Sequence, residues 1–308
     1  MGTRVIVIAG PTASGKSALA LGVAETLGGT VINADSMQVY RDLSVVTARP
    51  GAAELARAPH RLYGALDGAE LCSAARWAAL ARTAIEAAQA TGRLPILCGG
   101  TGLYLRTLLY GIAPVPAIPD EIRQAARQRH AELGGPAFQA ELARLDPEAA
   151  ARLEPGDRQR LIRAYEVVVA TGRPLADWHR AEPLAAGAFD PVIFTLLPPR
   201  DALYAAIDAR FAGMVEAGAL DEVERLMARR LDPALPVMKA VGVPELSAYL
   251  RGEISLETAI SQAQQASRRY AKRQFTWFRH QMSGAQVINE KYSINLPGRI
   301  CQIICKDA

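Results

Sequence analysis

A glycine-rich segment near the start of the chain has the residue types and spacing of a phosphate-binding loop. Its residues are Gly10, Pro11, Thr12, Ala13, Ser14, Gly15, Lys16 and Ser17. In such a loop, successive backbone N–H groups and the start of the following helix surround an anion. The lysine reaches the outer phosphates, and the serine hydroxyl can hold Mg²⁺. We expect a polyphosphate and magnesium here; the motif alone does not specify which polyphosphate, or which bond breaks.

Two further segments place polar side chains directly after apolar runs. Asp35, in the segment 35–38, follows the run 30–34, and Gly99-Gly100-Thr101-Gly102 follows the run 94–98. Asp35 could bind magnesium, accept a proton from a nucleophile or cap the next helix. The glycines of this turn could let the backbone approach a ligand closely, with Thr101 offering the only side-chain hydroxyl. The turn could also be no more than a tight strand-to-helix connection. The Lys-Ser ending of the first loop disfavours a dinucleotide site.

These segments must be positioned by strands and helices that alternate along the chain. Apolar runs at 5–8, 30–34, 94–98 and 191–197 predict strands, and the stretches between them have helical patterns. Strands separated by helices predict an α/β fold with a parallel sheet flanked by helices, of the P-loop NTPase type. The loop 10–17, Asp35 and the turn 99–102 should then line one crevice at the carboxyl ends of the strands.

The character of the sequence changes at the proline-rich segment 114–119. From there to about residue 188 only helical signals occur, including a helix that Asp157 should cap. We therefore predict an α/β core made of residues 1–114 and 189–288, with an all-helical insertion at 115–188. The tail, residues 289–308, is poor in alanine and rich in isoleucine, asparagine and lysine. We assign it no function and expect an atypical or partly ordered terminus.

Two segments concentrate basic residues. Gln159, Arg160 and Arg163 should face outward from the helix that begins after Asp157, where a solvated charged face is the ordinary alternative. The segment 267–280 interleaves arginine and lysine with aromatic residues. It could contact phosphates and bases, or pack as an amphipathic helix on the core, and both can hold at once.

Composition excludes several classes of protein. The 308 residues are 50% hydrophobic and 21% charged, and no apolar run approaches the length of a membrane span. The four cysteines give no pairing framework, and no zinc-ligand spacing is present. We expect a cytoplasmic protein without a signal peptide. The net charge of +4 permits a nucleic-acid partner without requiring one.

Taken together, these pieces resemble the tRNA dimethylallyltransferases, the bacterial isopentenyl-tRNA transferase family. The resemblance covers about residues 3–288, and the matching segments are 10–17, 33–41, 47–50, 99–104, 157–163, 238–242 and 270–279. The phosphate loop is common to many enzymes, but this combination is specific. Val243-Pro244 departs from the Tyr-Arg expected after Val-Gly, and the tail does not match the family.

The resemblance implies a prenyltransferase that moves a dimethylallyl group from dimethylallyl diphosphate to N6 of the adenine next to the anticodon on its 3′ side, releasing diphosphate. Lys16 and magnesium on Ser17 would neutralise the leaving group, Asp35 would be the general base, and Thr101 could touch the bridging oxygen. The enzyme would be a cytoplasmic monomer. The tRNA contacts that the family pattern implies are Asp35, Ser36, Met37, Gln38, Thr101, Arg123, Gln159, Arg160, Leu161, Ile162 and Arg163.

Three alternatives stay open at this level. A small-molecule kinase that binds ATP would have the same loop, although no arginine-bearing lid is evident. A prenyltransferase of free adenine nucleotides would need neither the helical insertion nor the basic segment near the C-terminus. A non-catalytic, nucleotide-gated RNA-binding protein would not need Asp35 and Thr101 to converge on the loop.

Overall fold

The computed structural model describes residues 2–182 and 189–306, which form two compact units. One unit comprises Met1–Leu109 with Gly187–Ala308, and the other is Tyr110–Ala186. A core interrupted by an insertion is therefore what the chain forms, although the first boundary lies at 109/110 instead of the predicted 114/115. The predicted second boundary, at 188/189, involves residue 188, which lies outside the described residues.

The first unit is built on a parallel sheet. Within the described residues it has six strands in the order β3-β2-β4-β1-β5-β6. The strands are β1 (Thr3–Ala9), β2 (Gly29–Asn33), β3 (His60–Arg61), β4 (Leu94–Gly99), β5 (Phe189–Leu196) and β6 (Gln286–Ile288). The four predicted strands are confirmed with small shifts of their ends. The sequence did not predict β3 and β6, because two or three residues are too few to show a periodic apolar pattern.

The central strand β1 divides the interior into two layers. Val5, Val7 and Ala9 belong to one hydrophobic cluster, whereas Ile6 and Ile8 belong to another. Side chains alternate along a strand, so both faces of β1 are buried, as is usual for a central strand of a parallel sheet. Ile6 lies in register with Ile96 of β4 and with Val192 of β5. This pairing brings the carboxyl ends of the strands to one edge of the sheet.

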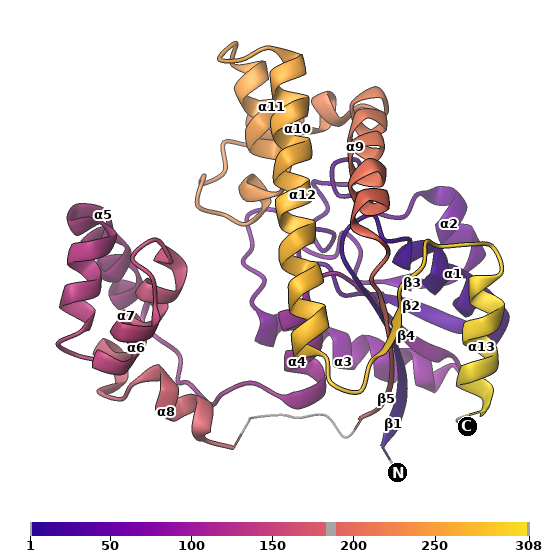
Figure 1. The fold of residues 1–308 in the computed structure, drawn as a ribbon, viewed down its shortest axis with the longest axis horizontal. Helices are drawn as coiled ribbons and strands as arrows, with labels where there is room; N and C mark the ends of the chain where they lie inside the picture. Colours follow the sequence, from indigo (N-terminus) through magenta and orange to yellow (C-terminus); the bar gives the residue numbers. More distant parts are fainter. Residues whose placement is uncertain (1, 183–188, 307–308) are drawn as a thin grey trace. The chain divides into compact units, whose positions relative to one another are not determined.

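Helices cover both faces of this sheet (Figure 1). Their ends follow local signals: Ser73 caps α3 by accepting a hydrogen bond from Arg76 N at 3.1 Å, and α1 ends at the left-handed Gly28. No helix within residues 2–182 and 189–306 has the length and hydropathy needed to cross a membrane. The helical elements are α1 (Lys16–Leu27), α2 (Ala52–Arg57), α3 (Ala74–Ala90), α4 (Gly102–Tyr110), α9 (Arg200–Glu216), α10 (Ala219–Ala228), the 3-10 turn η1 (Val237–Lys239), α11 (Val243–Leu250), α12 (Leu256–Gln281) and α13 (Leu296–Lys306).

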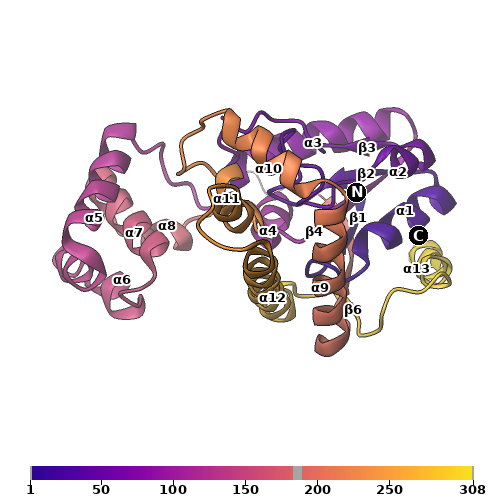
Figure 2. The same ribbon diagram turned by 90° about the horizontal axis from the view of Figure 1, so that it is seen from above.

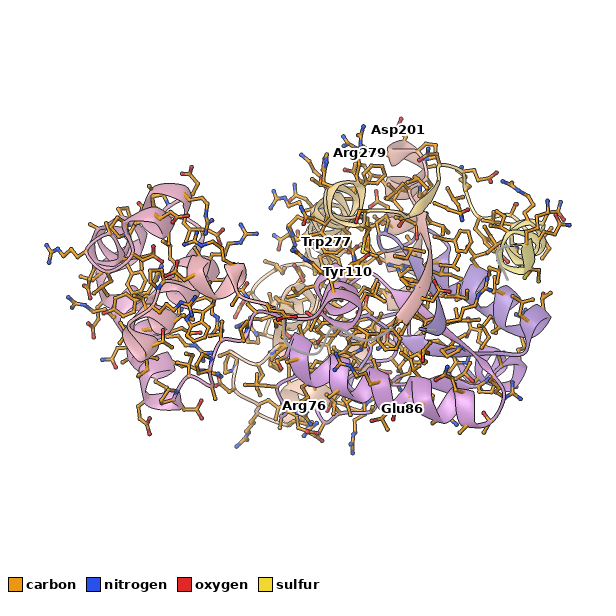
Figure 3. All side chains as sticks on the ribbon, turned by 90° about the horizontal axis from the view of Figure 1, so that it is seen from below. Arg76, Glu86, Tyr110, Asp201, Trp277 and Arg279 are labelled. Atoms are coloured by element: carbon orange, nitrogen blue, oxygen red, sulfur yellow. The ribbon has the colours of Figure 1, made fainter. Side chains whose placement is uncertain are left out.

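Helix α12 contains the basic and aromatic segment and packs beside α9, as Figure 2 shows. Its buried residues are Ala259, Ala263, Ala271, Gln274 and Phe278, which recur at helical spacing. The opposite face is exposed and includes Arg279, labelled in Figure 3. The helix therefore packs on the core, and it also presents a basic face to solvent.

The C-terminal tail is folded in its described part. Helix α13 packs against α1 and buries Leu296, Ile300 and Ile304 in the hydrophobic layer on that side of the sheet. Arg4 Nη2 also donates to Ile304 O at 2.6 Å. Residues 296–306 therefore form an ordered helix, in contrast to the partial order expected of the tail. Their apolar residues lie at helical spacing, and α1 offers a complementary face.

The second unit is all-helical in its described residues. Its elements are α5 (Asp120–Leu142), which is kinked at Gly134, α6 (Pro147–Arg152), α7 (Arg158–Thr171) and α8 (Leu175–Arg180). Asp157 caps α7 by accepting a hydrogen bond from Arg160 N, as predicted, and Gly172 ends this helix. Phe138, Leu142 and Leu161 are at the centre of its core.

Candidate active site

The phosphate-binding loop joins β1 to α1 and has the backbone geometry that the motif requires. Gly15 is the N-cap of α1 and has φ 91°, a left-handed conformation that favours glycine. The loop is also covered from the tail: a Cβ at Gly15 would lie 2.4 Å from Cβ of Tyr292. The start of α1, with its unpaired N–H groups, is therefore held at the carboxyl end of β1.

Lys16 and Ser17 begin α1 at this loop. Lys16 is partly buried, and its Nζ donates to Pro11 O at 3.3 Å. Burial lowers the pKa of Lys16, while the nearby Cys98 and Asp35 act in the opposite direction. Ser17 is exposed, and its hydroxyl interacts with the buried thiol of Cys98, whose pKa burial raises to about 11.

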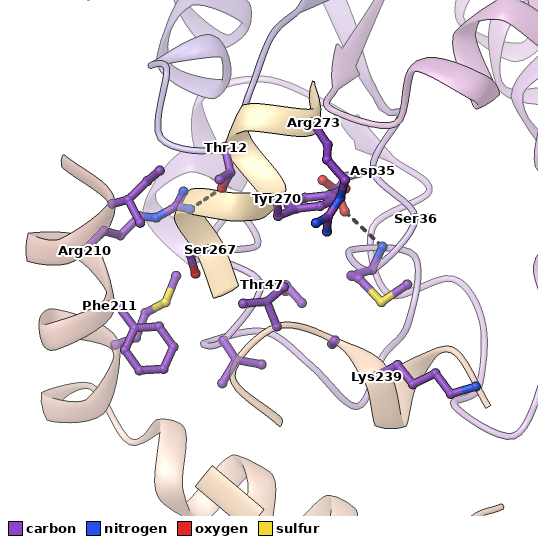
Figure 4. Close-up of a pocket in the computed structure, with 16 residues that line it drawn as sticks. Thr12, Asp35, Ser36, Thr47, Arg210, Phe211, Lys239, Ser267, Tyr270 and Arg273 are labelled. Carbon is purple, nitrogen blue, oxygen red and sulfur yellow. Dashed lines mark hydrogen bonds between the residues drawn. The ribbon is translucent and has the colours of Figure 1, made fainter. Parts of the chain in front are cut away.

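Asp35 follows β2 and lies at the same edge of the sheet. Its Oδ1 accepts hydrogen bonds from Met37 N at 2.9 Å and Gln38 N at 3.4 Å. The carboxylate therefore caps the turn 35–38, one of the roles that the sequence left open. It also lines a cavity, shown in Figure 4, so capping uses one oxygen of a carboxylate that faces open space.

Thr101, which follows β4, holds this turn from the other side. Its Oγ1 accepts from Ser36 N at 2.9 Å and donates to Ser36 Oγ at 3.3 Å. The hydroxyl of Tyr270 on α12 also interacts with Thr101 and Gln274, although burial raises the pKa of Tyr270. The structure thus brings Asp35 and Thr101 together, with Thr101 fixing the turn that carries the carboxylate.

Gln274 of α12 connects the two glycine-rich loops. Its Oε1 accepts from Thr12 N at 2.8 Å, and its Nε2 donates to Gly100 O at 2.8 Å. Gly100 is needed at this contact, because a Cβ there would lie 2.2 Å from Nε2 of Gln274. A buried side-chain amide that is satisfied on both sides fixes the spacing of the loops.

Arg210 of α9 is a site residue that sequence reasoning missed. Its guanidinium donates a hydrogen bond to the hydroxyl of Thr12, drawn in Figure 4. Burial lowers the pKa of Arg210, whereas the negative charge of Asp35 acts to raise it. The position of Arg210 among the apolar residues Ile207, Phe211 and Met214 on one side of α9 is visible in the sequence, but nothing local indicates that its partner is Thr12.

Thr12, Asp35 and Arg210 line a cavity of about 250 Å³ in the first unit. One part of the lining is polar and includes Thr12, Asp35 and Arg210, with Arg273 and Lys239 as further cations. The other part is apolar, with Val46, Ile207, Phe211 and Met214 in its wall. The cavity thus offers cations for an anion, a carboxylate for a proton and a surface for a short hydrocarbon group.

The expected tRNA contacts at Arg123 and at 159–163 belong to the second unit. Arg160 Nη1 donates to Asp157 Oδ2 at 2.8 Å, and Arg163 Nη1 donates to Glu166 Oε1 at 2.7 Å. Gln159 is exposed. Arg123 is partly buried, and its Nη1 lies 4.0 Å from Asp120 Oδ1.

The tRNA contacts expected of Leu161 and Ile162 stay a prediction to which their side chains would contribute little. These side chains are 0% and 8% exposed, respectively, because they form the core of the second unit. Leu161 therefore has no side-chain surface to offer an RNA, and Ile162 has little. The departure at Val243-Pro244 also has a structural explanation, since Pro244 lies in the first turn of α11, where its missing N–H costs nothing.

Comparison with known proteins agrees with this geometry. The IPP transferase family model matches residues 38–281. The tRNA dimethylallyltransferase of Rhodospirillum rubrum is 59% identical over 288 residues, covering 93% of this chain and 88% of the relative. That of Rhodospirillum centenum is 57% identical over 285 residues, covering 92% and 90%.

Solved structures give the same answer. The tRNA isopentenylpyrophosphate transferase of Bacillus halodurans has a TM-score of 0.72 at 33% identity, covering 99% of this chain and 96% of the other. A eukaryotic dimethylallyltransferase acting on tRNA has a TM-score of 0.76 at 29% identity, covering 90% and 70%. With a phosphate loop, a carboxylate and an apolar wall around one cavity, and with relatives of this similarity along its length, the chain belongs to the IPP transferase family.

Proposed function

We propose that this protein transfers a dimethylallyl group from dimethylallyl diphosphate to N6 of the adenine 3′-adjacent to the anticodon in tRNA, releasing diphosphate. One observation carries the proposal: partly buried Lys16 and Arg210 stand at the phosphate loop, and Asp35 faces the cavity between that loop and an apolar wall. The protein would act as a monomer in the cytoplasm, where tRNA is modified.

The leaving group suits the phosphate loop. When the bond between C1 of the dimethylallyl group and the bridging oxygen breaks, its electron pair leaves with the diphosphate. Lys16, Arg210 and the N–H groups at the start of α1 are placed to stabilise the charge that develops. Such groups are already oriented before the reaction, so little reorganisation is needed as charge moves.

The nucleophile needs a group that accepts a proton. As the exocyclic amine of adenine attacks C1, a C–N bond forms and one N6 proton must leave. Asp35 is the carboxylate of the cavity, and one of its oxygens already holds the turn 35–38. The other oxygen would take the proton as general base. Thr101 would act by fixing Ser36 and hence this turn.

The residues present also suit a magnesium ion. In residues 2–182 and 189–306, no group of three or more His, Cys, Asp or Glu residues could hold a metal. Magnesium, however, is commonly bound through substrate phosphates and water with few protein ligands. The hydroxyl of Ser17, at the start of α1, would be such a ligand, and the ion would add positive charge beside the diphosphate.

The second unit would bind the anticodon stem-loop. The side chains of Arg160 and Arg163 are 76% and 39% exposed, and each pairs with an acid three residues away on or beside α7. The exposed pair of Arg160 with Asp157 contributes little stability, so Arg160 can exchange its carboxylate for a phosphate. Arg163 is held more firmly, because its partner Glu166 is only 7% exposed. Gln159 and Arg123 would add contacts. The target adenine must leave its stack, which a loop allows at less cost than a duplex.

The function is tested with labelled dimethylallyl diphosphate and purified protein. We expect label in unmodified tRNA, none in AMP, and no requirement for ATP. Transfer to AMP would instead favour a prenyltransferase of free nucleotides. A strict requirement for ATP with no transfer to tRNA would favour a kinase.

Replacing Asp35 by asparagine tests the general base. Asn keeps an oxygen for the N–H groups of Met37 and Gln38, so the turn should persist, but it cannot accept the proton. We expect kcat to fall by about 10²–10⁴-fold, with the Kd for tRNA unchanged. Asp190→Asn, an exposed change at the start of β5, is the control. Near-normal turnover of Asp35→Asn would exclude this role.

Arg210→Gln tests the second cation at the phosphate loop. Removing it should lower kcat/KM for dimethylallyl diphosphate by about 10²–10³-fold and weaken inhibition by inorganic diphosphate, whereas KM for tRNA should not change. Arg200→Gln, at the exposed start of the same helix, is the matched control. Equal inhibition of the wild type and Arg210→Gln by diphosphate would contradict the assignment.

The double variant Arg160→Ala/Arg163→Ala tests the second unit. Binding of tRNA should weaken, and the slope of log K against log salt should become shallower by about 0.7 to 0.9 per lost phosphate contact. Arg93→Ala is an exposed control that precedes β4, at the sheet edge away from the cavity. Filter binding over a range of salt measures both effects, and an unchanged slope would rule out phosphate contacts by this pair.

A further inference from the structure

A buried carboxylate on α10 takes no direct part in the proposed transfer reaction. Glu222 is 3% exposed. Its Oε1 accepts from Ser44 N at 2.6 Å, Ser44 Oγ at 2.8 Å and Val45 N at 2.9 Å. Its Oε2 accepts from Val46 N at 2.9 Å and Val45 N at 3.0 Å. Charge-assisted hydrogen bonds from successive N–H groups hold a backbone segment strongly in one conformation.

The backbone that Glu222 holds forms part of the cavity. Val46, whose N–H donates to Glu222, lines the cavity together with the next residue, Thr47. The other end of this segment is held by Gln38, whose Nε2 donates to Thr47 O at 2.8 Å and Ala48 O at 3.0 Å. Gln38 belongs to the turn that Asp35 caps. The loop 44–48 is therefore fixed between α10 on one side and the Asp35 turn on the other.

Val46 stands in the apolar part of the cavity wall, together with Phe211 and Met214. Gly242 lies against both Val46 and Phe211: a Cβ there would be 4.0 Å from Val46 Cβ and 2.9 Å from Phe211 Cε2. The polar part of the lining, at Thr12 and Arg210, is where the proposed function places the diphosphate. A prenyl chain attached to that diphosphate would extend toward the apolar wall.

We propose that Glu222 is a positioning residue that fixes the loop 44–48, and with it the wall that limits the length of the prenyl donor. This proposal rests on the proposed function, because it concerns the same cavity and the same donor. Glu222 itself does not line the cavity; it acts through the backbone of Ser44, Val45 and Val46.

Loss of the Glu222 carboxylate should change the selectivity for the prenyl donor. In Glu222→Gln, one carboxylate oxygen becomes an NH₂ group, which cannot accept from a backbone N–H. At least one N–H then faces a donor, and the loop must move. Apolar pockets discriminate substrates by size only within limits, so a wall that moves admits longer chains. Val46→Ala should have the same effect by removing part of the wall itself.

The experiment compares dimethylallyl diphosphate with the longer geranyl diphosphate as donors to tRNA. For Glu222→Gln, we expect the ratio of kcat/KM for the short donor to that for the long donor to fall at least about tenfold, with KM for tRNA unchanged. Glu224→Gln makes the same chemical change at an exposed position on the same helix and should keep the wild-type ratio.

Glu222→Gln with the wild-type ratio overturns the proposal, even if its unfolding temperature is lower, because a merely structural role would not change donor choice. If Glu222→Gln does not fold, Ser44→Ala removes only the hydroxyl hydrogen bond and should lower the ratio by a smaller factor. An unchanged ratio in Ser44→Ala would then overturn it. Failure of the proposed function is distinguishable, because the wild type would transfer neither donor to tRNA.

Discussion

The placement of two cations at the phosphate loop is the constraint on which the rest of the site depends. Lys16 and Arg210 both have pKa values lowered by burial, which means that the protein environment disfavours their charged forms. The nearby carboxylate, Asp35, acts on both in the opposite direction, but one of its oxygens is engaged by backbone N–H groups. A polyanion at the phosphate loop would pair with both cations. The free-energy cost of burying these two positive charges is already present in the folded protein, so the attraction to the anion would favour binding.

Such a site works only if the loops around it do not move. The turn at Asp35, the turn at Thr101 and the phosphate loop come from three different strands, and each is short. Gln274 joins two of them, Thr101 joins the third through Ser36, and Gln38 extends the network to the loop 44–48. Helix α12 therefore does more than cover the sheet, since one buried amide from it fixes the spacing between the phosphate loop and the turn 99–102.

The sequence was most informative where chemistry is local. The phosphate loop, the capping of α7 by Asp157 and the convergence of three loops at one sheet edge follow from spacing, caps and strand topology, and all three were predicted. Arg210 and Glu222 were missed because their partners lie far away in the sequence, at Thr12 and at 44–46. No local pattern encodes such contacts. Leu161 stands within a basic motif, and helical periodicity places its side chain in the core.

The two kinds of positive charge in this protein have different physical consequences. Lys16 and Arg210 are partly buried, so salt screens their attraction for an anion only weakly. Arg160 is largely exposed and paired with a neighbouring acid, so its attraction for a phosphate is strongly screened and easily exchanged. In the proposed reaction, a small diphosphate must be held firmly enough for its charge to be stabilised as it leaves, whereas a large RNA must be released after each turnover. Burial at the phosphate loop and exposure on α7 would meet these two requirements with the same type of side chain.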